Sequence, residues 1–207
     1  MSKAVMLSIR PKWCEKIVNG NKTIEVRKTR PKMNPPFKCY IYCTLPKYPH
    51  EDFIATNYPM PQFYGGGKVI GEFTCDRVYE IRKRGVPENY DYCYLSLNEW
   101  GNDDIAAEIN AISASCGSKG ELNAYGARTP VLYGWHISNL RIYDTPRDLG
   151  EFSPECTYKA DDGTCPSRRV ACSFQRYDDN QDGTINIVEC GRVIERPPQS
   201  WCYVEED

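Results

Sequence analysis

Hydrophobic and polar positions at the start of the chain predict a strand followed by a short helix. Residues 4–9 form an apolar run that is broken only by a serine, which is typical of a strand. Residues 12–19 carry apolar side chains at helical spacing, and Pro11 before them fits the first turn of a helix. Gly20 predicts the end of this helix, because glycine adopts the left-handed conformation of a helix C-terminus at little cost.

A second strand is predicted at residues 23–28, where apolar and polar positions alternate. Its polar face carries Thr23, Glu25 and Arg27, while Lys22 stands at the turn that leads from the helix into this strand. Because Glu25 and Arg27 share one face of the strand, they can pair with each other or bracket a ligand.

Later runs of the sequence predict further short strands and few helices. Strands are expected at residues 39–45, 69–78, 133–143 and 201–204, and helices at residues 98–115 and near 119–124. Many short strands with few helices indicate a mainly β (α+β) protein built on a small β-barrel with flanking helices. We expect the barrel in residues 1–152, a Cys-rich insertion in residues 153–198, and a final strand within residues 199–207 that returns to the barrel.

Charge is distributed unevenly along the chain, although the net charge is only −2. Residues 1–47 hold 11 basic and 2 acidic side chains, whereas the remainder holds 15 basic and 26 acidic ones. A basic segment in an acidic chain suggests a local site for a polyanion. A solvated face whose charges are balanced elsewhere in the fold would explain the same distribution.

The sequence favours a cytoplasmic protein with free thiols. No apolar stretch approaches the roughly 18–20 residues that cross a bilayer, and the run at residues 4–7 is too short for an export signal. The cysteine count, 11, is odd, so most of these residues are expected to be free thiols. The cysteines in strand-like runs are expected to be small buried apolar residues; they are Cys39, Cys43, Cys75 and Cys93.

The segment around the predicted helix and second strand resembles the ASCH domain of the PUA-like superfamily. The signature of that family is G-x-K-x-x-E-x-R after a short helix. Its four positions are filled here by Gly20, Lys22, Glu25 and Arg27. The resemblance extends to residues 68–78 and 133–144. The amino-acid sequence of residues 11–15 and 196–204 is similar to that of ASCH proteins carried by phages and prophages of Gram-positive bacteria.

This resemblance implies a PUA-like small β-barrel with a charged cleft that binds RNA or a nucleotide-like ligand. The residues expected to contact the ligand are Arg10, Lys22, Glu25 and Arg27. Arg27 has the planar fork that suits a phosphate or the edge of a base, and Lys22 can reach into a cleft from its turn. A simple ion-pair network that holds the helix to the barrel would use the same side chains.

The family also includes bacterial amidohydrolases that act on N4-acetylcytidine, so an enzyme is an alternative. Lys22 matches their lysine, and Glu72 is expected to match their glutamate on a later strand. Glu25 stands where they have a threonine, so the catalytic candidates Lys22, Glu25 and Glu72 lack the nucleophile of that mechanism. A third hypothesis is a phage interaction protein that binds no nucleic acid.

Geometry can discriminate among these hypotheses. Convergence of Lys22, Glu25, Arg27 and Glu72 in one open cleft would favour a ligand-binding site. A closed, buried network of the same side chains would favour the interaction protein.

Four cysteines in the C-terminal part suggest a structural metal site; they are Cys156, Cys165, Cys172 and Cys190. Four thiolates suit tetrahedral zinc, and a segment with few apolar residues gains order from a metal. We therefore predict one structural zinc, although the spacings are wider than the C-x-x-C of strong zinc motifs.

An overlapping pattern, at residues 178–189, matches the twelve-residue calcium loop of EF-hand proteins. Its calcium ligands would be Asp178, Asn180, Asp182 and Glu189. The pattern occurs once, and prolines and glycines crowd the helices that should flank it. A metal-free hairpin, with an Asp-Gly turn between two strands, would explain the same residue pattern.

Overall fold

The computed structural model describes residues 3–48, 53–57, 62–84, 91–95, 115, 117–155, 175–179, 185–190 and 193–206. The helices are α1 (Pro11–Val18) and α3 (Lys119–Gly126), with a 3-10 turn at Leu149–Glu151. The strands are β1 (Lys3–Ile9), β2 (Ile24–Arg27), β3 (Phe37–Cys43), β4 (Phe53–Ile54), β5 (Phe63–Tyr64), β6 (Lys68–Cys75), β7 (Val78–Arg84), β8 (Asp91–Leu95), β9 (Val131–His136), β10 (Ser138–Asp148), β11 (Gln175–Asp179), β12 (Ile185–Cys190) and β13 (Trp201–Glu205).

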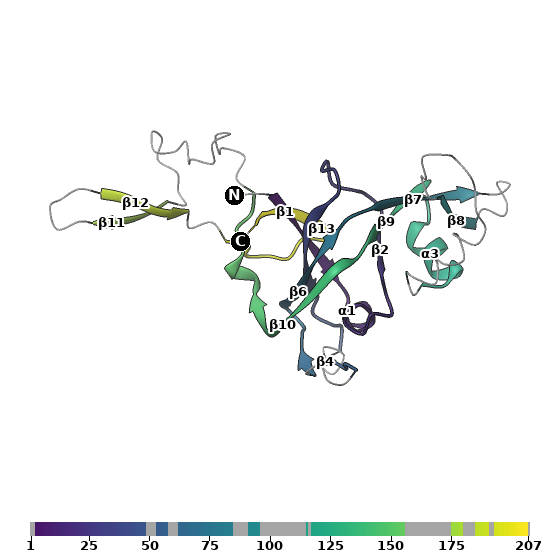
Figure 1. The fold of residues 1–207 in the computed structure, drawn as a ribbon, viewed down its shortest axis with the longest axis horizontal. Helices are drawn as coiled ribbons and strands as arrows, with labels where there is room; N and C mark the ends of the chain where they lie inside the picture. Colours follow the sequence, from purple (N-terminus) through teal and green to yellow (C-terminus); the bar gives the residue numbers. More distant parts are fainter. Residues whose placement is uncertain are drawn as a thin grey trace.

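The largest sheet has five strands in the order β10-β6-β3-β1-β13. β1 and β3 run parallel, and the other pairs are antiparallel. The predicted last strand is confirmed, because β13 lies beside β1 with Val204 opposite Ala4. The two ends of the described chain therefore lie side by side at one edge of this sheet (Figure 1).

A second sheet has four strands in the order β2-β9-β7-β8. Besides the longer connections from β1 to β2 and from β2 to β3, the chain passes between the two sheets at two short corners, at Asp76-Arg77 between β6 and β7 and at Ile137 between β9 and β10. The single strands expected at residues 69–78 and 133–143 are thus each two strands in different sheets. Backbone hydrogen bonds hold this corner, since the His136 amide donates to the Arg77 carbonyl at 2.9 Å.

The expected closed barrel is replaced by two open sheets in the described residues. The edges of the larger sheet are β10 and β13, and those of the smaller sheet are β2 and β8. Side chains, rather than a backbone ladder, join β2 and the loop after it to the larger sheet. Arg27 Nη2 donates to the Ser8 carbonyl at 2.8 Å, and Trp201 Nε1 donates to Thr29 Oγ1 at 2.9 Å.

Helix α1 forms where the sequence predicts it. Pro11 stands in its first turn, and Gly20 beyond its end has a φ of +70°, as a glycine stop requires. Its buried side chains are Pro11, Cys14, Ile17 and Val18. They pack on a core that includes Leu7 of β1 and Trp135 of β9, so the helix covers one face of the larger sheet.

The opposite face of the larger sheet carries a second core. Tyr40 and Phe152 are fully buried there, with ring centroids 4.9 Å apart, beside Met6 and Val204. The segment that contains Phe152 follows β10, and its residues 153–155 bond to β13. Two faces of one sheet are therefore covered by different segments.

Several expectations fall partly or wholly outside the described residues. These are the helix at 98–115, apart from Ser115, and most of the Cys-rich insertion. Within the insertion, β11 and β12 form an antiparallel pair in which Asp178 lies opposite Asn186. None of the described helices is long and apolar enough to cross a membrane.

Candidate ligand-binding groove

A groove of about 870 Å³ lies beside α1, β2 and α3. The segment before β13 also lines it, through Pro197, Pro198, Gln199 and Ser200. Three of the four residues of the sequence motif contribute to the lining, namely Lys22, Glu25 and Arg27. Arg10, the other predicted ligand contact, lines the groove as well.

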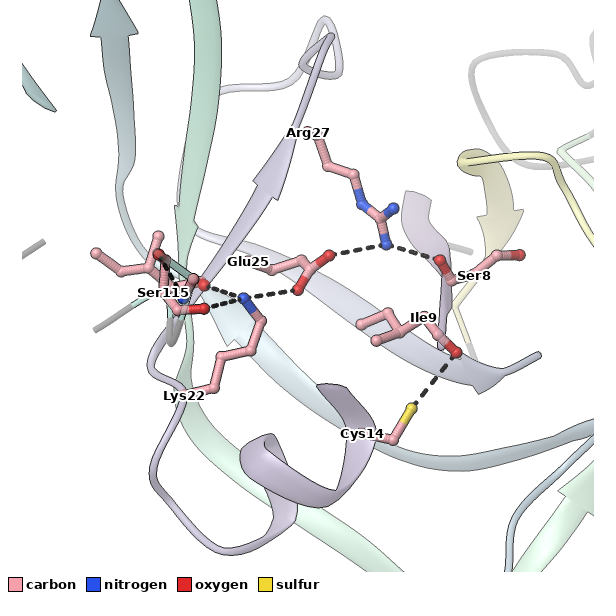
Figure 2. Close-up of polar contacts among 9 residues, drawn as sticks. Ser8, Ile9, Cys14, Lys22, Glu25, Arg27 and Ser115 are labelled. Carbon is pink, nitrogen blue, oxygen red and sulfur yellow. Dashed lines mark hydrogen bonds and ion pairs between the residues drawn. The ribbon is translucent and has the colours of Figure 1, made fainter. Parts of the chain in front are cut away.

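The motif side chains form one network beneath the groove (Figure 2). Glu25 stands between the two cations: its Oε2 lies 3.3 Å from Lys22 Nζ, and its Oε1 lies 3.1 Å from Arg27 Nη2. All three residues are buried, with exposures of 5% for Lys22, 5% for Glu25 and 8% for Arg27. Because a lone charge in such a setting is very unfavourable, each of the three depends on the others.

The ammonium of Lys22 is occupied by protein acceptors. It donates to the Ile24 carbonyl at 2.7 Å and to the Ser115 carbonyl at 2.8 Å, in addition to its ion pair with Glu25. An ammonium has three protons, so these three neighbours match its full capacity. Lys22 therefore ties the start of β2 to the segment before α3 and is not poised to bind a ligand.

Arg27 is the third member of the network, and one of its nitrogens has no hydrogen-bond partner among the described residues. Its Nη2 bonds to Glu25 and to the Ser8 carbonyl, whereas its Nε is buried without a hydrogen-bond partner in the described structure. Ser8 itself is fixed, because its hydroxyl donates to the Pro198 carbonyl at 2.6 Å. The guanidinium thus links β2, β1 and the segment before β13, and it lines the groove that they enclose.

Strand β2 forms where the sequence predicts it, but burial does not alternate along it, because Ile24 is buried as well as the two polar residues that follow it. Glu25 and Arg27 are buried, while Val26 is only half-buried. Alternation shows which residues share a face, and it does not show which face points inward. Charged side chains face inward here because they meet one another and backbone carbonyls.

The rim of the groove is basic and aromatic. Arg10 and Lys28 are exposed, and neither has an ion pair within the described part of the chain. Lys28 Nζ lies 5.1 Å from the ring centroid of Tyr125, and partial burial raises the pKa of that phenol. On the other side, Trp13 presents its ring 4.2 Å from Lys12 Nζ.

Glu72 lies in a different pocket, on the opposite face of the larger sheet. This pocket, of about 490 Å³, is lined by Lys38, Tyr40, Glu72, Arg141, Ile142, Tyr143, Asp144, Thr145 and Arg147. The Tyr143 hydroxyl donates to Glu72 Oε2 at 2.8 Å, and Lys38 Nζ lies 3.7 Å from the same oxygen. Burial, followed by this bond to a carboxylate, raises the pKa of Tyr143. The structure therefore does not bring Glu72 to Lys22.

The predicted metal sites lie outside the described residues, or at positions whose side chains are not described. This holds for the zinc ligands and for the calcium ligands, so both stay predictions. In the described residues no group of three or more His, Cys, Asp or Glu side chains could hold a metal. The segments around the calcium-loop pattern are the strands β11 and β12, as the hairpin alternative expects.

Three of the four cysteines predicted in strands have described side chains, and these are buried free thiols, as the sequence indicates. These are Cys39, Cys43 and Cys75, and Cys14 of α1 is buried too. Burial raises the pKa of the Cys39 and Cys14 thiols well above the ordinary value, and raises that of Cys75 to about 12. Such thiols behave as small apolar side chains.

Several groove residues were not found from the sequence. Ser115, Tyr125 and the segment before β13 come from distant parts of the chain and meet the motif only after folding. Glu121 had a local signal, because Ser118 and Glu121 form the S-x-x-E capping box at the start of α3.

Comparisons with known proteins agree with the motif. A sequence model of the ASCH domain matches residues 7–42. That segment runs from β1 through α1 and β2 to β3, so it contains all four motif residues and Arg10.

Solved structures of ASCH proteins from Zymomonas mobilis are also similar to this chain. One is 14% identical, with a TM-score of 0.43, over 70% of this chain and 73% of that one. A tyrosine-to-phenylalanine mutant of that protein is 15% identical, with a TM-score of 0.43, over 72% and 77% of the two chains. A serine-to-alanine mutant is 15% identical, with a TM-score of 0.42, over 70% and 74%. No curated protein matches the chain.

Proposed function

We propose that the groove binds RNA or a nucleotide-like ligand, mainly through phosphates. The observation that carries this proposal is the rim, where exposed Arg10 and Lys28 stand beside the aromatic rings of Trp13 and Tyr125. Cationic side chains that follow a groove attract the backbone of a nucleic acid, and aromatic rings stack on its bases. The ASCH match over residues 7–42 supports the same class of ligand.

The motif residues have different parts in this proposal. Lys22 and Glu25 build the floor, because Lys22 is directed at two backbone carbonyls and at Glu25, and Glu25 at Lys22 and Arg27. Arg27 is the floor residue that lines the groove with a guanidinium, the group that suits phosphate. Contact with the ligand is therefore assigned mainly to Arg10, Arg27 and Lys28.

An amidohydrolase is less well supported by this geometry. Lys22 is saturated by protein acceptors, Glu72 lines another pocket, and the threonine of the enzymes is Glu25 here. Incubation with N4-acetylcytidine followed by chromatography is expected to show no deacetylation. Turnover by the wild type that is lost in Lys22→Ala would instead show that the protein is an amidohydrolase.

A phage interaction protein without nucleic-acid binding is the second candidate. The burial of Lys22, Glu25 and Arg27 in one network favours it, because this network also stabilises the fold without any ligand. The two candidates differ in whether the exposed rim binds RNA.

Titration with labelled single-stranded RNA at several salt concentrations tests the proposal. Affinity should fall linearly with salt on a double-logarithmic plot. The double variant Arg10→Ala/Lys28→Ala should lower the slope by about 1.4, because each phosphate that is no longer neutralised accounts for about 0.7 on a single strand. These exposed residues can be replaced with little effect on folding.

Lys16→Ala is the matched control. Lys16 is an exposed lysine of α1 that does not line the groove, so its removal takes away one positive charge at another place, as each of the single rim variants Arg10→Ala and Lys28→Ala does at the groove. Binding that is independent of salt, or equal decreases in affinity in Lys16→Ala and in each rim variant, would contradict the proposal.

A further inference from the structure

An ion pair joins two walls of the groove. Lys12 Nζ of α1 and Glu121 Oε1 of α3 lie 3.3 Å apart, although the two residues are 109 positions apart in the sequence. Both residues line the groove, and both side chains are about half exposed. A carboxylate thus sits on one of the cations that a ligand would otherwise meet.

The carboxylate is held in this position by the cap of α3. Glu121 Oε2 accepts a hydrogen bond from the Ser118 amide at 3.0 Å, and the Ser118 hydroxyl accepts one from the Glu121 amide at 3.1 Å. The other oxygen, Oε1, is left to face Lys12. The bond from Ser118, and then the contact with Lys12, lowers the pKa of Glu121, so the group is ionised at neutral pH.

The lysine is held by an aromatic ring as well as by Glu121, and the acidic partner distinguishes it from the other rim cations. The ring of Trp13 lies 4.2 Å from Lys12 Nζ, which favours this position of the ammonium. Arg10 and Lys28, in contrast, have no acidic partner within the described part of the chain. The groove therefore has cations that are ready for phosphate and one that already has an internal anion.

We propose that Glu121 is a specificity-determining residue of the groove, because its carboxylate takes the place of a ligand phosphate at Lys12. This inference rests on the proposed function. While the pair is closed, the groove contacts phosphates through Arg10, Arg27 and Lys28. Only a ligand that places a further phosphate at the α1–α3 end gains by opening the pair, and exposed ion pairs are weak enough to be opened.

Four proteins separate this effect from a general change in charge: the wild type, Glu121→Gln, Lys12→Gln and the double variant. Glutamine keeps the oxygen that caps α3, so Glu121→Gln removes the charge and leaves the capping box. Thermal unfolding of each variant checks that the fold is retained. The probe is a labelled uridine oligonucleotide, titrated at several salt concentrations.

Glu121→Gln should bind the oligonucleotide about two- to fivefold more tightly, because one weak surface pair no longer competes. The salt slope should steepen by about 0.7, the value of one more phosphate contact on a single strand. Lys12→Gln should weaken binding much more in the Glu121→Gln background than in the wild type. In the double variant the higher affinity of Glu121→Gln should disappear.

The outcomes also separate this inference from the proposed function. A gain in affinity that persists undiminished in the Lys12→Gln background would be a general charge effect and would overturn the inference alone. An unchanged affinity and slope in Glu121→Gln, with normal wild-type binding, would do the same. Absence of salt-dependent binding in all four proteins would overturn the proposed function and this inference with it.

Discussion

Glu25 holds two cations in the interior of the fold, which makes it the most sensitive residue of the groove floor. Its two carboxylate oxygens face Lys22 and Arg27, and all three side chains are buried. Loss of a residue that pairs buried charges leaves those charges uncompensated, and this costs more than the pair itself contributes. The stability of the groove therefore depends on a side chain that needs no contact with the ligand.

Replacement of Glu25 by alanine tests this dependence. Glu25→Ala should lower the free energy of unfolding by about 3–5 kcal/mol, because it strands two buried cations. Urea unfolding gives this value from the transition midpoint and slope. Glu195→Ala is the control, since Glu195 is exposed and should change stability by less than about 0.5 kcal/mol. Equal, small effects of the two variants would show that the network contributes little to folding.

At the scale of elements, the sequence predicted the helix and strand boundaries that depend on neighbouring residues alone. Pro11 in the first turn and Gly20 after the last turn delimit α1, and β2 lies within the predicted range of residues 23–28. The prediction of one strand each at residues 69–78 and 133–143 was wrong. Each segment forms two strands in different sheets, and the change of sheet depends on pairing with distant strands.

The sequence also could not predict which face of the sheet a given strand residue occupies. The enzyme alternative would bring Glu72 to Lys22, yet β3 and β6 pair so that Glu72 lies opposite Tyr40, whose ring packs in the second core. Register between strands depends on distant pairing, and a shift of one residue would exchange the two faces. The motif itself was predictable, because its four residues lie within eight positions of the chain.

Gly71 shows how closely β6 and β10 approach each other, and it gives a prediction at this scale. A Cβ at this position would lie 2.4 Å from the Arg141 carbonyl oxygen and 3.0 Å from the Ile142 side chain. Because a backbone atom cannot move aside as a side chain does, Gly71→Ala should lower the free energy of unfolding by about 1–3 kcal/mol.

Gly150→Ala provides the comparison for that measurement. A Cβ at Gly150 meets nothing within 4 Å, and the position lies just beyond the same strand β10. Its urea midpoint should stay close to that of the wild type. If Gly71→Ala also leaves the urea midpoint unchanged, the close pairing of β6 with β10 does not stabilise this edge of the sheet.

At the scale of the whole molecule, the two faces of the larger sheet carry two distinct pockets. One is the groove beside α1, β2 and α3, with Trp13 and Tyr125 among its lining residues. The other surrounds Glu72, with Tyr40 and Tyr143. Both contain arginine and lysine side chains, so binding of RNA alone would not show which face is used.

Cations in the second pocket have acidic neighbours, in contrast to Arg10 and Lys28 at the groove rim. Lys38 lies near both Glu72 and Glu206, and Arg147 pairs with Glu151 at 3.0 Å. Phosphate would have to compete with these carboxylates, whereas Arg10 and Lys28 have no acidic partner in the described part of the chain. We therefore assign the ligand to the groove.

Ultraviolet cross-linking of bound single-stranded RNA, followed by mass spectrometry of the peptides, tests that assignment most directly. Bases that stack in the groove should cross-link to Trp13 or Tyr125, and the cross-links should diminish as salt is raised. Cross-links confined to Tyr40 or Tyr143, or to the exposed Tyr48 and Tyr64, would place the ligand elsewhere and contradict the assignment.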